Sequence, residues 1–531
     1  MNTALTRPLG AQMSHMLKDR GVDVIFGIPG VHNVELYRGI EEAGIKHILA
    51  RHEQGAGFMA DGYARATGKP GVAYLITGPG LCNAMTAMGQ GYSDSVSMLV
   101  ISSCLDEIAN RRGQLHQMKD QEAAARTVCD WSETALTADA AYGLIDRALV
   151  EFETKRKRPK HIQVPIDVLG TAVAGPSDDA LRGSLPLARP ADVAAAAEWL
   201  AAAKRPMFIF GGGAVAGFEE ARELMALTGA ACFTTYAGRG IIPSGNPLNY
   251  GAYLAMSDSA REIESADLVI AVGTELAEVD IWRPTVGKCT TLIRVDIDPE
   301  NLMDAHRADL PIMGDAKTFM RDVADLLTGH KNNAQWDVHH VKTCLESWHA
   351  ETDAARPGVV KFGDALAEIL PDNTTIYSDM TQIAYVLKNT QPVDRPGYWH
   401  HPYGFGTLGY ALPAAIGGKV GVGDDPVISI IGDYGFHYTM QELGVAVELG
   451  LSLPIILWDN GKLKEIEDAM VRSQIAPNAV IAQNPDFCKL AEAFGAKAVA
   501  PEDIAAFKVA VTEALDADGP TLIYITPDVR D

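Results

Sequence analysis

The sequence predicts an α/β fold with three doubly wound parallel sheets. Short runs of β-branched and other apolar residues alternate with longer amphipathic stretches along the whole chain, which is the pattern of repeated strand–helix–strand units. Two segments, near 168–193 and 328–358, are rich in Gly, Pro or polar residues and break this alternation. We therefore expect domains at about 1–170, 190–330 and 355–531, joined by linkers with room for a connecting helix.

The expected strands form three groups, one in each block. In chain order they are VDVIFGIPG (22–30), GVAYLITGPG (71–80) and SMLVISSC (97–104), then RPMFIFGGG (205–213), DLVIAVGTE (267–275) and TLIRVDIDP (291–299), then TTIYSDM (374–380), PVISIIGD (426–433), LPIILWDN (453–460) and TLIYITPD (521–528). Ligands bind beyond the carboxyl ends of strands in open parallel sheets. Because nearly every Gly-rich or polar cluster falls at such an end, an enzyme is favoured over a scaffold.

Charge and composition exclude several classes of partner. The 45 basic and 68 acidic residues give a net charge of −23, which argues against nucleic acid or an anionic membrane as the main partner. We find neither a signal-peptide pattern nor a run of about 18 apolar residues, so no membrane partner and a cytoplasmic location are expected. The seven cysteines are scattered and lack a CxxC pair, which predicts reduced thiols, and no His/Cys cluster has zinc spacing.

The stretch from 430 to 460, IIGDYGFHYTMQELGVAVELGLSLPIILWDN, carries the first chemical signal. Asp433 follows one expected strand, at a strand-to-helix turn where free N–H groups and the helix dipole favour a phosphate. Asn460 follows the next strand, and both side chains supply the hard oxygen ligands that Mg²⁺ or Ca²⁺ prefers. The pattern predicts a diphosphate held on Mg²⁺. Simple capping of two neighbouring helices is the alternative.

Three further stretches make the pattern specific. The stretches resemble acetolactate synthases and related thiamine diphosphate-dependent 2-oxo acid decarboxylases, and the resemblance runs through all three blocks in the order expected for that family. They are FGIPG (26–30), RHEQGAGFMADGYARATGKPGVAYLITGPGLCNA (51–84) and GTLGYALPAAIGGKV (406–420). The resemblance implies a pyrimidine-binding domain, a central Rossmann-like domain and a diphosphate- and metal-binding domain, in the three blocks given above. It also implies thiamine diphosphate and Mg²⁺ as cofactors, and a homodimer or homotetramer with active sites at the subunit interface.

The resemblance assigns the metal to Asp433, Asn460 and the backbone carbonyl of Lys462. The match has two departures, because Tyr434 replaces the usual glycine and Asp459-Asn460 replaces the usual Asn-Asn pair. The residues implied to contact the cofactor are Pro29, Thr77, Gly78, Asn83, Thr381, Gln382, Gly406, Leu408, Asp433, Tyr434 and Gly435.

Among these, Leu408 matches the bulky residue that presses the two cofactor rings together, a proximity effect. Without the resemblance it would be assigned to the core. The Gly406 carbonyl would accept from the cofactor's 4′-amino group. Thr381 and Gln382 align with contacts to the diphosphate, and helix capping is their alternative.

Glu53 aligns with the family glutamate that binds N1′ of the aminopyrimidine and promotes loss of the thiazolium C2 proton. The alternative is an exposed glutamate that begins a helix. His32 is a candidate proton donor because histidine titrates near working pH, and its neighbour Val31 supplies no proton. His116 falls near the paired histidines of pyruvate-type decarboxylases. Each histidine has the alternative of an ordinary loop residue.

Two more candidates come from neighbouring loops. Gln121 resembles an active-site glutamine of acetolactate synthases. Glu465 lies close to where pyruvate-type decarboxylases carry an essential glutamate, and it would relay protons or meet a positive substrate tail. A solvated glutamate between lysines is the alternative for Glu465.

The reaction implied by the resemblance is decarboxylation of a 2-oxo acid to an aldehyde and CO₂. FGIPGVHNVELYRGI (26–40) is most similar to the decarboxylases that act on the guanidino acid derived from arginine, so a cationic substrate such as 5-guanidino-2-oxopentanoate is expected. An acidic pocket residue would pair with the guanidinium in a bidentate manner. The alternatives are an acetolactate synthase-type carboligase and a regulatory subunit that binds the cofactor without catalysis.

The central block offers a triple glycine, Gly211-Gly212-Gly213, after an expected strand. Such a stretch admits a dinucleotide backbone or allows close strand–helix packing. No acidic residue follows the next strand, ACFTTYAG (231–238), so packing is favoured. The acidic stretch GTELAEVDIW (273–282) argues against bound FAD.

Overall fold

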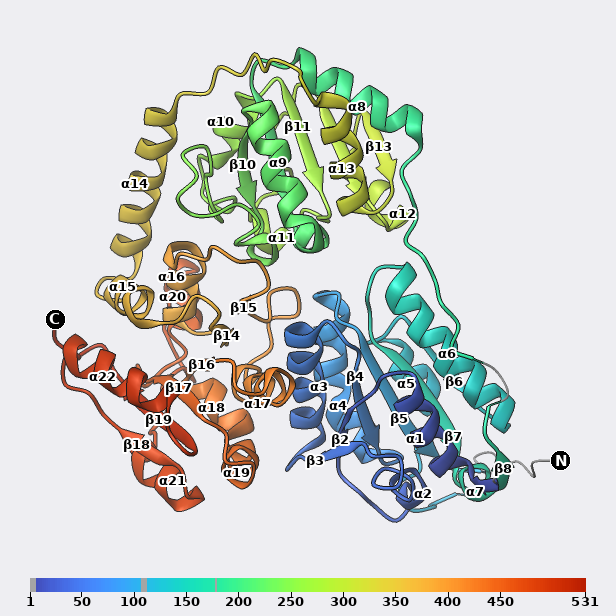
Figure 1. Ribbon diagram of the computed structural model, residues 1–531. Helices are drawn as coiled ribbons and strands as arrows, with labels where there is room; N and C mark the ends of the chain where they lie inside the picture. The colour runs from blue at the N-terminus through green and yellow to red at the C-terminus, as the bar shows by residue number, and fades with distance from the viewer. Residues whose placement is uncertain (1–5, 107–111, 177–178) are drawn as a thin grey trace. The chain divides into compact units, whose positions relative to one another are not determined.

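A computed structural model describes residues 6–106, 112–176 and 179–531 of the chain. It contains three mainly parallel sheets covered by helices, which confirms the predicted fold class (Figure 1). The chain divides into two compact units. The first consists of Met1–Gly183, Ile376–Thr381 and His401–Arg530, and the second of Ser184–Thr375, Gln382–His400 and Asp531. The expected domain boundaries at 170, 190, 330 and 355 stay a prediction.

The N-terminal sheet has six strands in the order β3-β2-β4-β5-β7-β6, and its neighbouring strands are parallel. The strands are β2 (Val24–Gly27), β3 (Lys46–Leu49), β4 (Gly71–Leu75), β5 (Met98–Cys104), β6 (Trp131–Thr134) and β7 (Lys160–Pro165). The helices are α1 (Leu9–Asp19), α2 (Val34–Tyr37), α3 (Glu53–Thr67), α4 (Pro79–Ser93), α5 (Gln121–Arg126), α6 (Ala138–Thr154) and α7 (Ile166–Gly170). A small antiparallel pair joins β1 (Thr6–Pro8) to β8 (Ala172–Ala174).

Helices bury both faces of this sheet. Phe26 and Ala73 point to one side and pack with residues of α3 and α4. Ile25 and Val72, their neighbours along the strands, point to the other side and pack with α1 and α6. Successive strand residues face opposite sides, so both kinds must be apolar. This two-sided burial explains the continuous apolar runs in the sequence.

The C-terminal sheet has the order β15-β14-β16-β17-β19-β18. Its strands are β14 (Thr375–Ser378), β15 (Trp399–His400), β16 (Val427–Gly432), β17 (Leu453–Trp458), β18 (Lys497–Val499) and β19 (Pro520–Ile525). The helical segments from α17 onward are α17 (Ala411–Val422), α18 (Asp433–Thr439), η3 (Met440–Glu442), α19 (Leu443–Glu448), α20 (Lys464–Arg472), α21 (Phe487–Phe494) and α22 (Ile504–Leu515). The strand-to-helix turn expected at Asp433 is confirmed, because β16 ends at Gly432 and α18 begins at Asp433.

Helices α3 and α17 pack against each other and join the N-terminal and C-terminal sheets into one core (Figure 1). Glycines allow their backbones to approach closely. A Cβ atom on Gly62 would lie 1.9 Å from the carbonyl oxygen of Ala414, and one on Gly417 would lie 1.9 Å from that of Met59. Any side chain at either position would therefore push the two helices apart.

The central sheet belongs to the second unit and has the parallel order β10-β9-β11-β12-β13. Its strands are β9 (Pro206–Phe210), β10 (Ala231–Thr234), β11 (Leu268–Val272), β12 (Leu292–Asp296) and β13 (Leu310–Met313). The helical segments of this unit are α8 (Pro190–Ala202), η1 (Gly212–Gly217), α9 (Phe218–Thr228), η2 (Tyr236–Gly238), α10 (Ser259–Glu264), α11 (Glu278–Ile281), α12 (Pro299–Leu302), α13 (Ala316–Leu327), α14 (Val338–Ala355), α15 (Val360–Ile369) and α16 (Gln382–Thr390).

One face of the central sheet packs with α8, α9 and α13. The other face packs with Ile263 of α10 and with Val341 and Trp348 of α14. The second expected linker, 328–358, therefore contains an 18-residue helix whose apolar side belongs to the core of the central domain.

The triple glycine lies where β9 meets η1. A Cβ atom on Gly211 would lie 2.3 Å from the carbonyl oxygen of Gly273, in the turn after β11, and one on Gly213 would lie 2.9 Å from the Cα atom of Gly273. Two adjacent strand ends thus approach too closely for side chains. This close approach supports the packing interpretation.

The contact between α3 and α17 predicts that Gly62→Ala and Gly417→Ala each destabilise the protein by about 3 kcal/mol, because the added methyl overpacks against backbone. Urea denaturation measures the change. Gly143→Ala is the matched control, since it lies inside α6 with nothing within 4 Å of its Cβ position. That variant should gain about 0.5–1 kcal/mol from helix propensity. Unchanged stability in both of the first two variants would contradict the close contact.

Candidate active site

Glu53 begins α3, at the end of the sheet where the turns after β2 and β4 lie. Its Oε2 accepts a hydrogen bond from Nδ2 of Asn83 on α4, at 2.9 Å. A Cβ atom on Gly80 would lie 3.4 Å from Oε1 of Glu53. Pro29, in the turn after β2, is exposed. The structure therefore joins Glu53 and Asn83, two residues from different parts of the motif at 51–84.

Gln121 holds the turn between β4 and α4. Its Oε1 accepts from the backbone N–H of Gly78 at 2.9 Å, and its Nε2 donates to the Ser103 carbonyl at 2.9 Å. Gly78 has φ of +70°, and a Cβ atom there would lie 2.4 Å from the carbonyl oxygen of His116. Thr77 is buried and shares a 2.7 Å hydrogen bond with the Ser103 hydroxyl. Gln121 thus orders the turn, and its expected catalytic role stays a prediction.

His32 and His116 lie side by side, although 84 residues separate them in the chain. Their Nδ1 atoms are 3.3 Å apart, and their rings meet edge to face with centroids 4.8 Å apart. Burial lowers the pKa of His32 below its usual value, and the neighbouring His116 lowers it further, while the charge of Asp106 opposes both. The lowered pKa favours the neutral form of His32.

In the C-terminal sheet, the buried Asp379 organises the loop that leads into α17. Its Oδ2 accepts from the backbone N–H of Gly409 at 2.8 Å, and the Thr439 hydroxyl donates to the Gly409 carbonyl at 2.8 Å. Burial raises the pKa of Asp379 to about 7, although backbone N–H donors lower it in part. These contacts fix the segment of Gly406, which has φ of +68°, and the half-buried Leu408.

Other predicted cofactor contacts fall in two groups. A Cβ atom on Gly432 would lie 2.8 Å from the Thr381 hydroxyl oxygen, and one on Gly435 would lie 2.7 Å from Oδ2 of Asp379. Thr381 and Gly435 thus lie at the same end of the sheet as Asp433. Gln382 is instead the first residue of α16, in the second unit.

Asp433 lies beside a second carboxylate. Nδ2 of Asn484 donates to Oδ2 of Asp433 at 2.8 Å and to Oδ1 of Asp459 at 2.9 Å, and the Tyr524 hydroxyl donates to Oδ2 of Asp459 at 2.9 Å. Burial raises the pKa of Asp433 to about 6, Asn484 opposes this shift, and the charge of Asp459 adds to it. A cation would offset this crowded negative charge, and oxygen donors are those that Mg²⁺ prefers. The residues present therefore fit the expected ion.

The turn after β17 carries the other predicted ligands. Oδ1 of Asn460 accepts from the backbone N–H of Lys462 at 3.2 Å, so these two residues form one tight turn. The Lys462 ammonium pairs with Glu467 at 3.1 Å. Glu465 is half-buried in the first turn of α20, and Tyr434 is half-buried in the first turn of α18.

The sequence reasoning missed Asn484 and Tyr524 and treated Asp459 only as a departure from the family pattern. Asn484 lies in the irregular segment before α21, where Asn484-Pro485 indicates a turn but no pattern points to contact with distant carboxylates. Its role depends on two carboxylates that lie 51 and 25 residues earlier.

The chain matches three family descriptions in the order of the blocks. Residues 7–124 match the N-terminal TPP binding domain of thiamine pyrophosphate enzymes, residues 193–323 the central domain, and residues 379–525 the C-terminal TPP binding domain. A relative from Pseudomonas aeruginosa, named "Probable 2-ketoarginine decarboxylase AruI", is 41% identical over 99% of this chain and 95% of its own. The chain belongs to the thiamine pyrophosphate enzymes.

More distant relatives of this thiamine pyrophosphate enzyme are acetolactate synthases. The large subunit of isozyme 3 from Escherichia coli is 28% identical over 92% of this chain and 88% of its own. The Mycobacterium bovis acetolactate synthase is 29% identical over 93% and 83%, respectively. Within the described residues, no helix is both long and apolar enough to span a membrane.

In this thiamine pyrophosphate enzyme, a further buried carboxylate lies next to the glutamate that the resemblance assigns to the cofactor. Glu442 accepts hydrogen bonds from the backbone N–H of Arg51, with its Oε2 at 3.0 Å, and a Cβ atom on Gly55 would lie 2.3 Å from its Oε1. Burial raises the pKa of Glu442 to about 7, and the charge of Glu53 adds to this shift, while backbone N–H groups and the charge of Arg51 oppose it.

When burial raises the pKa of a carboxyl group in the folded protein, the folded state holds its proton more tightly than the unfolded state does. The protein is then most stable at low pH, where the group is protonated in both the folded and the unfolded state. This stabilisation is lost as pH rises from the unfolded value, near 4.5, through about 7. We therefore predict that the free energy of unfolding of the parent protein falls by about 3 kcal/mol over this pH interval because of Glu442. The Glu442→Gln variant should not show this fall.

The measurement is the unfolding temperature of both proteins at a series of pH values between 4.5 and 8. The variant should gain on the parent protein as pH rises and keep a constant advantage above pH 7. Parallel curves for the two proteins would show that Glu442 does not titrate in this interval.

Proposed function

We propose that this enzyme uses thiamine diphosphate and Mg²⁺ to decarboxylate a 2-oxo acid with a cationic tail, such as 5-guanidino-2-oxopentanoate, to an aldehyde and CO₂. The main support is the 41% identity to the Pseudomonas aeruginosa relative named for 2-ketoarginine, which extends over 99% of the chain. The acetolactate synthases match over a similar length at only 28–29% identity.

The cofactor supplies an electron sink for the carbanion that decarboxylation leaves. Asp433, Asn460 and the Lys462 carbonyl would hold Mg²⁺. Glu53, held by Asn83, would bind the aminopyrimidine and keep a proton at N1′. The segment of Gly406 and Leu408 would orient the cofactor rings. The hydrogen bonds at Glu53, Asp379 and Asp433 support these roles, because each carboxylate is fixed by other protein groups before a cofactor binds.

The remaining predicted cofactor contacts divide between the pyrimidine half and the diphosphate half of the cofactor. Pro29, Thr77 and Gly78 would contact the pyrimidine half from the turns after β2 and β4. Thr381, Gln382, Tyr434 and Gly435 would contact the diphosphate half.

Proton supply distinguishes an aldehyde-forming decarboxylase from a carboligase. His32 and His116 are two titratable groups with Nδ1 atoms 3.3 Å apart, so a proton held by one is readily shared with the other. Such a pair supports protonation of the reacting carbon and release of an aldehyde. Glu465 would meet the cationic tail or relay a proton.

Carboligation of the acetolactate synthase type is the second candidate. It is supported by the acetolactate synthase relatives and by Gln121, whose amide is buried at the turn of Gly78. A regulatory subunit that binds the cofactor without turnover is disfavoured, since Glu53, Leu408, Asp433 and Asn460 are all present.

We also propose a homodimer or homotetramer whose active sites lie between subunits. Large apolar side chains next to the predicted site residues support this assembly. Val31 and Leu115, neighbours of His32 and His116, are 66% and 62% exposed. Phe405, next to Gly406, is 50% exposed. Burying such side chains against a second copy would exclude water from the site.

The function is tested by measuring CO₂ release from a panel of 2-oxo acids with thiamine diphosphate and Mg²⁺ present. We expect guanidino and amino 2-oxo acids to be preferred over uncharged ones, and pyruvate alone to give no acetoin after acid treatment. Glu53→Gln should fold and bind the cofactor but lose about 10²-fold or more in rate. Preference for uncharged acids would reject the cationic substrate, and acetoin formation would favour carboligation.

The histidine pair gives a separate prediction. His32→Gln and His116→Gln should each lower the rate of aldehyde formation by about 10²-fold, because each removes half of a proton-sharing pair. Product analysis by chromatography measures the rate. His330→Gln, at an exposed position of the second unit, is the control and should match the parent enzyme. Full activity in both pair variants would remove the histidines from the mechanism.

A further inference from the structure

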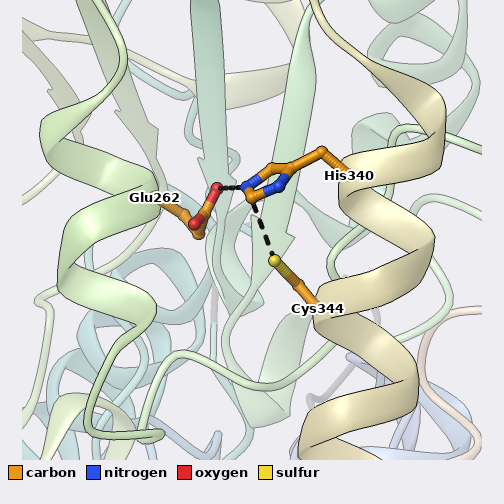
Figure 2. A group of neighbouring side chains, drawn as sticks. All are labelled: Glu262, His340 and Cys344. Atoms are coloured by element: carbon orange, nitrogen blue, oxygen red, sulfur yellow. Dashed lines mark hydrogen bonds and ion pairs between the residues drawn. The ribbon is translucent and has the colours of Figure 1, made fainter.

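A second cluster of ligand-type side chains lies in the central domain, within the second unit. Glu262 on α10 and His340 and Cys344 on α14 point toward one another, and their ligand atoms all lie within 4.8 Å of one another (Figure 2). Sequence spacing does not reveal this cluster, because Glu262 precedes His340 by 78 residues. His340 and Cys344 are one helical turn apart, so α14 presents both on the same side.

Two distances within the cluster are close to those around a metal ion. Nε2 of His340 lies 3.6 Å from Sγ of Cys344 and 2.9 Å from Oε2 of Glu262. Across a tetrahedral zinc ion with Zn–N near 2.05 Å and Zn–S near 2.3 Å, nitrogen and sulfur lie about 3.6 Å apart, and nitrogen and oxygen about 3.3 Å. The distance between Nε2 of His340 and Sγ of Cys344 already equals the nitrogen–sulfur distance around zinc. The Glu262 carboxylate would need to move away from Nε2 by only a few tenths of an ångström.

The surroundings of the cluster favour a cation. The Tyr250 hydroxyl donates to Oε2 of Glu262 at 2.8 Å, which orients the carboxylate in the way that outer hydrogen bonds orient metal ligands. Asp258 lies close enough to act electrostatically on Cys344. A bound cation would offset the negative charges of Glu262 and Asp258.

We propose that Glu262, His340 and Cys344 bind Zn²⁺, with water in the fourth position, and that the ion fixes α14 to α10. Thiolate and imidazole ligands select zinc over Mg²⁺. The half-exposed His340 side chain, at 50% exposure, leaves an entry path from solvent. Further along α14, the indole of Trp348 already donates to Asp258 at 2.6 Å. The ion would fasten the first turns of the same helix.

Cobalt spectroscopy on the full chain tests the proposal. The protein is reduced, treated with a chelator, and supplied with thiamine diphosphate and excess Mg²⁺ so that the cofactor site is occupied. Added Co²⁺ should then give a sulfur-to-cobalt charge-transfer band that saturates at one ion per chain and that Zn²⁺ abolishes. Zn²⁺ should also raise the unfolding temperature by about 5 °C. Without a charge-transfer band, the proposal is wrong.

Variants identify the site. His340→Gln and Cys344→Ser should each weaken Zn²⁺ binding by about 100-fold or more and abolish the thermal shift, while folding at the parent temperature in the absence of zinc. His339→Gln, at the exposed neighbouring position, and Cys289→Ser, elsewhere in the same unit, are matched controls that should bind like the parent protein. Undiminished binding in the first two variants would place the ion elsewhere and overturn the assignment.

Discussion

The backbone contact between α3 and α17 holds the N-terminal and C-terminal sheets of the chain together in one core. Gly62 and Gly417 let the two helices approach until carbonyl oxygens of one occupy the space of side chains on the other. Buried polar groups stabilise this contact. Asp61 of α3 accepts hydrogen bonds from Arg65 of the same helix at 2.6 Å and from the hydroxyl of Tyr410, just before α17, at 2.7 Å. Removing one partner would leave an uncompensated buried charge, which is strongly unfavourable. Because α3 begins with the predicted catalytic glutamate and α17 follows the Leu408 loop, this contact fixes where one chain presents each of these groups to the proposed sites between subunits.

Much of this architecture could be predicted from local patterns. Strand ends, the turn at Asp433 and the family motif are properties of short segments, and the sequence displays them directly. The hydrogen bonds of Asn484 and the packing of His32 on His116 depend on segments that meet only in the folded chain. Neither shows a periodicity, and a single polar residue in an irregular loop is compatible with many environments. The second linker was expected to have room for a connecting helix, but its polar composition did not show that one side of this helix, at Val341, packs into the core of the central domain.

Asp459 stands where the family pattern has an asparagine, and this replacement changes the electrostatics of the predicted metal site. Two carboxylates lie where the family pattern has one, and the raised pKa of Asp433 reflects the cost of ionising it in a buried place beside a second charge. Asn484 and Tyr524 offset part of this cost by donating hydrogen bonds to the pair. Neither carries a positive charge, so the proposed divalent cation would best relieve the remaining repulsion. Ionisation of Asp433 and occupancy by that cation should therefore be coupled more tightly than with a neutral asparagine at 459.

The two proposed ion sites differ in ligand chemistry in a way that keeps Mg²⁺ out of the cluster on α14. Asp433, Asn460 and a backbone carbonyl offer only hard oxygen atoms, which suit Mg²⁺ and its retained waters. His340 and Cys344 offer imidazole nitrogen and sulfur, which bind Mg²⁺ poorly and zinc well. Because the abundant hard ion gains little at the cluster on α14, a zinc ion there would not need to compete with it. The same chain could thus use one ion to carry a diphosphate and another to fasten a helix, with ligand type excluding Mg²⁺ from the cluster and an excess of Mg²⁺ keeping zinc from the oxygen site.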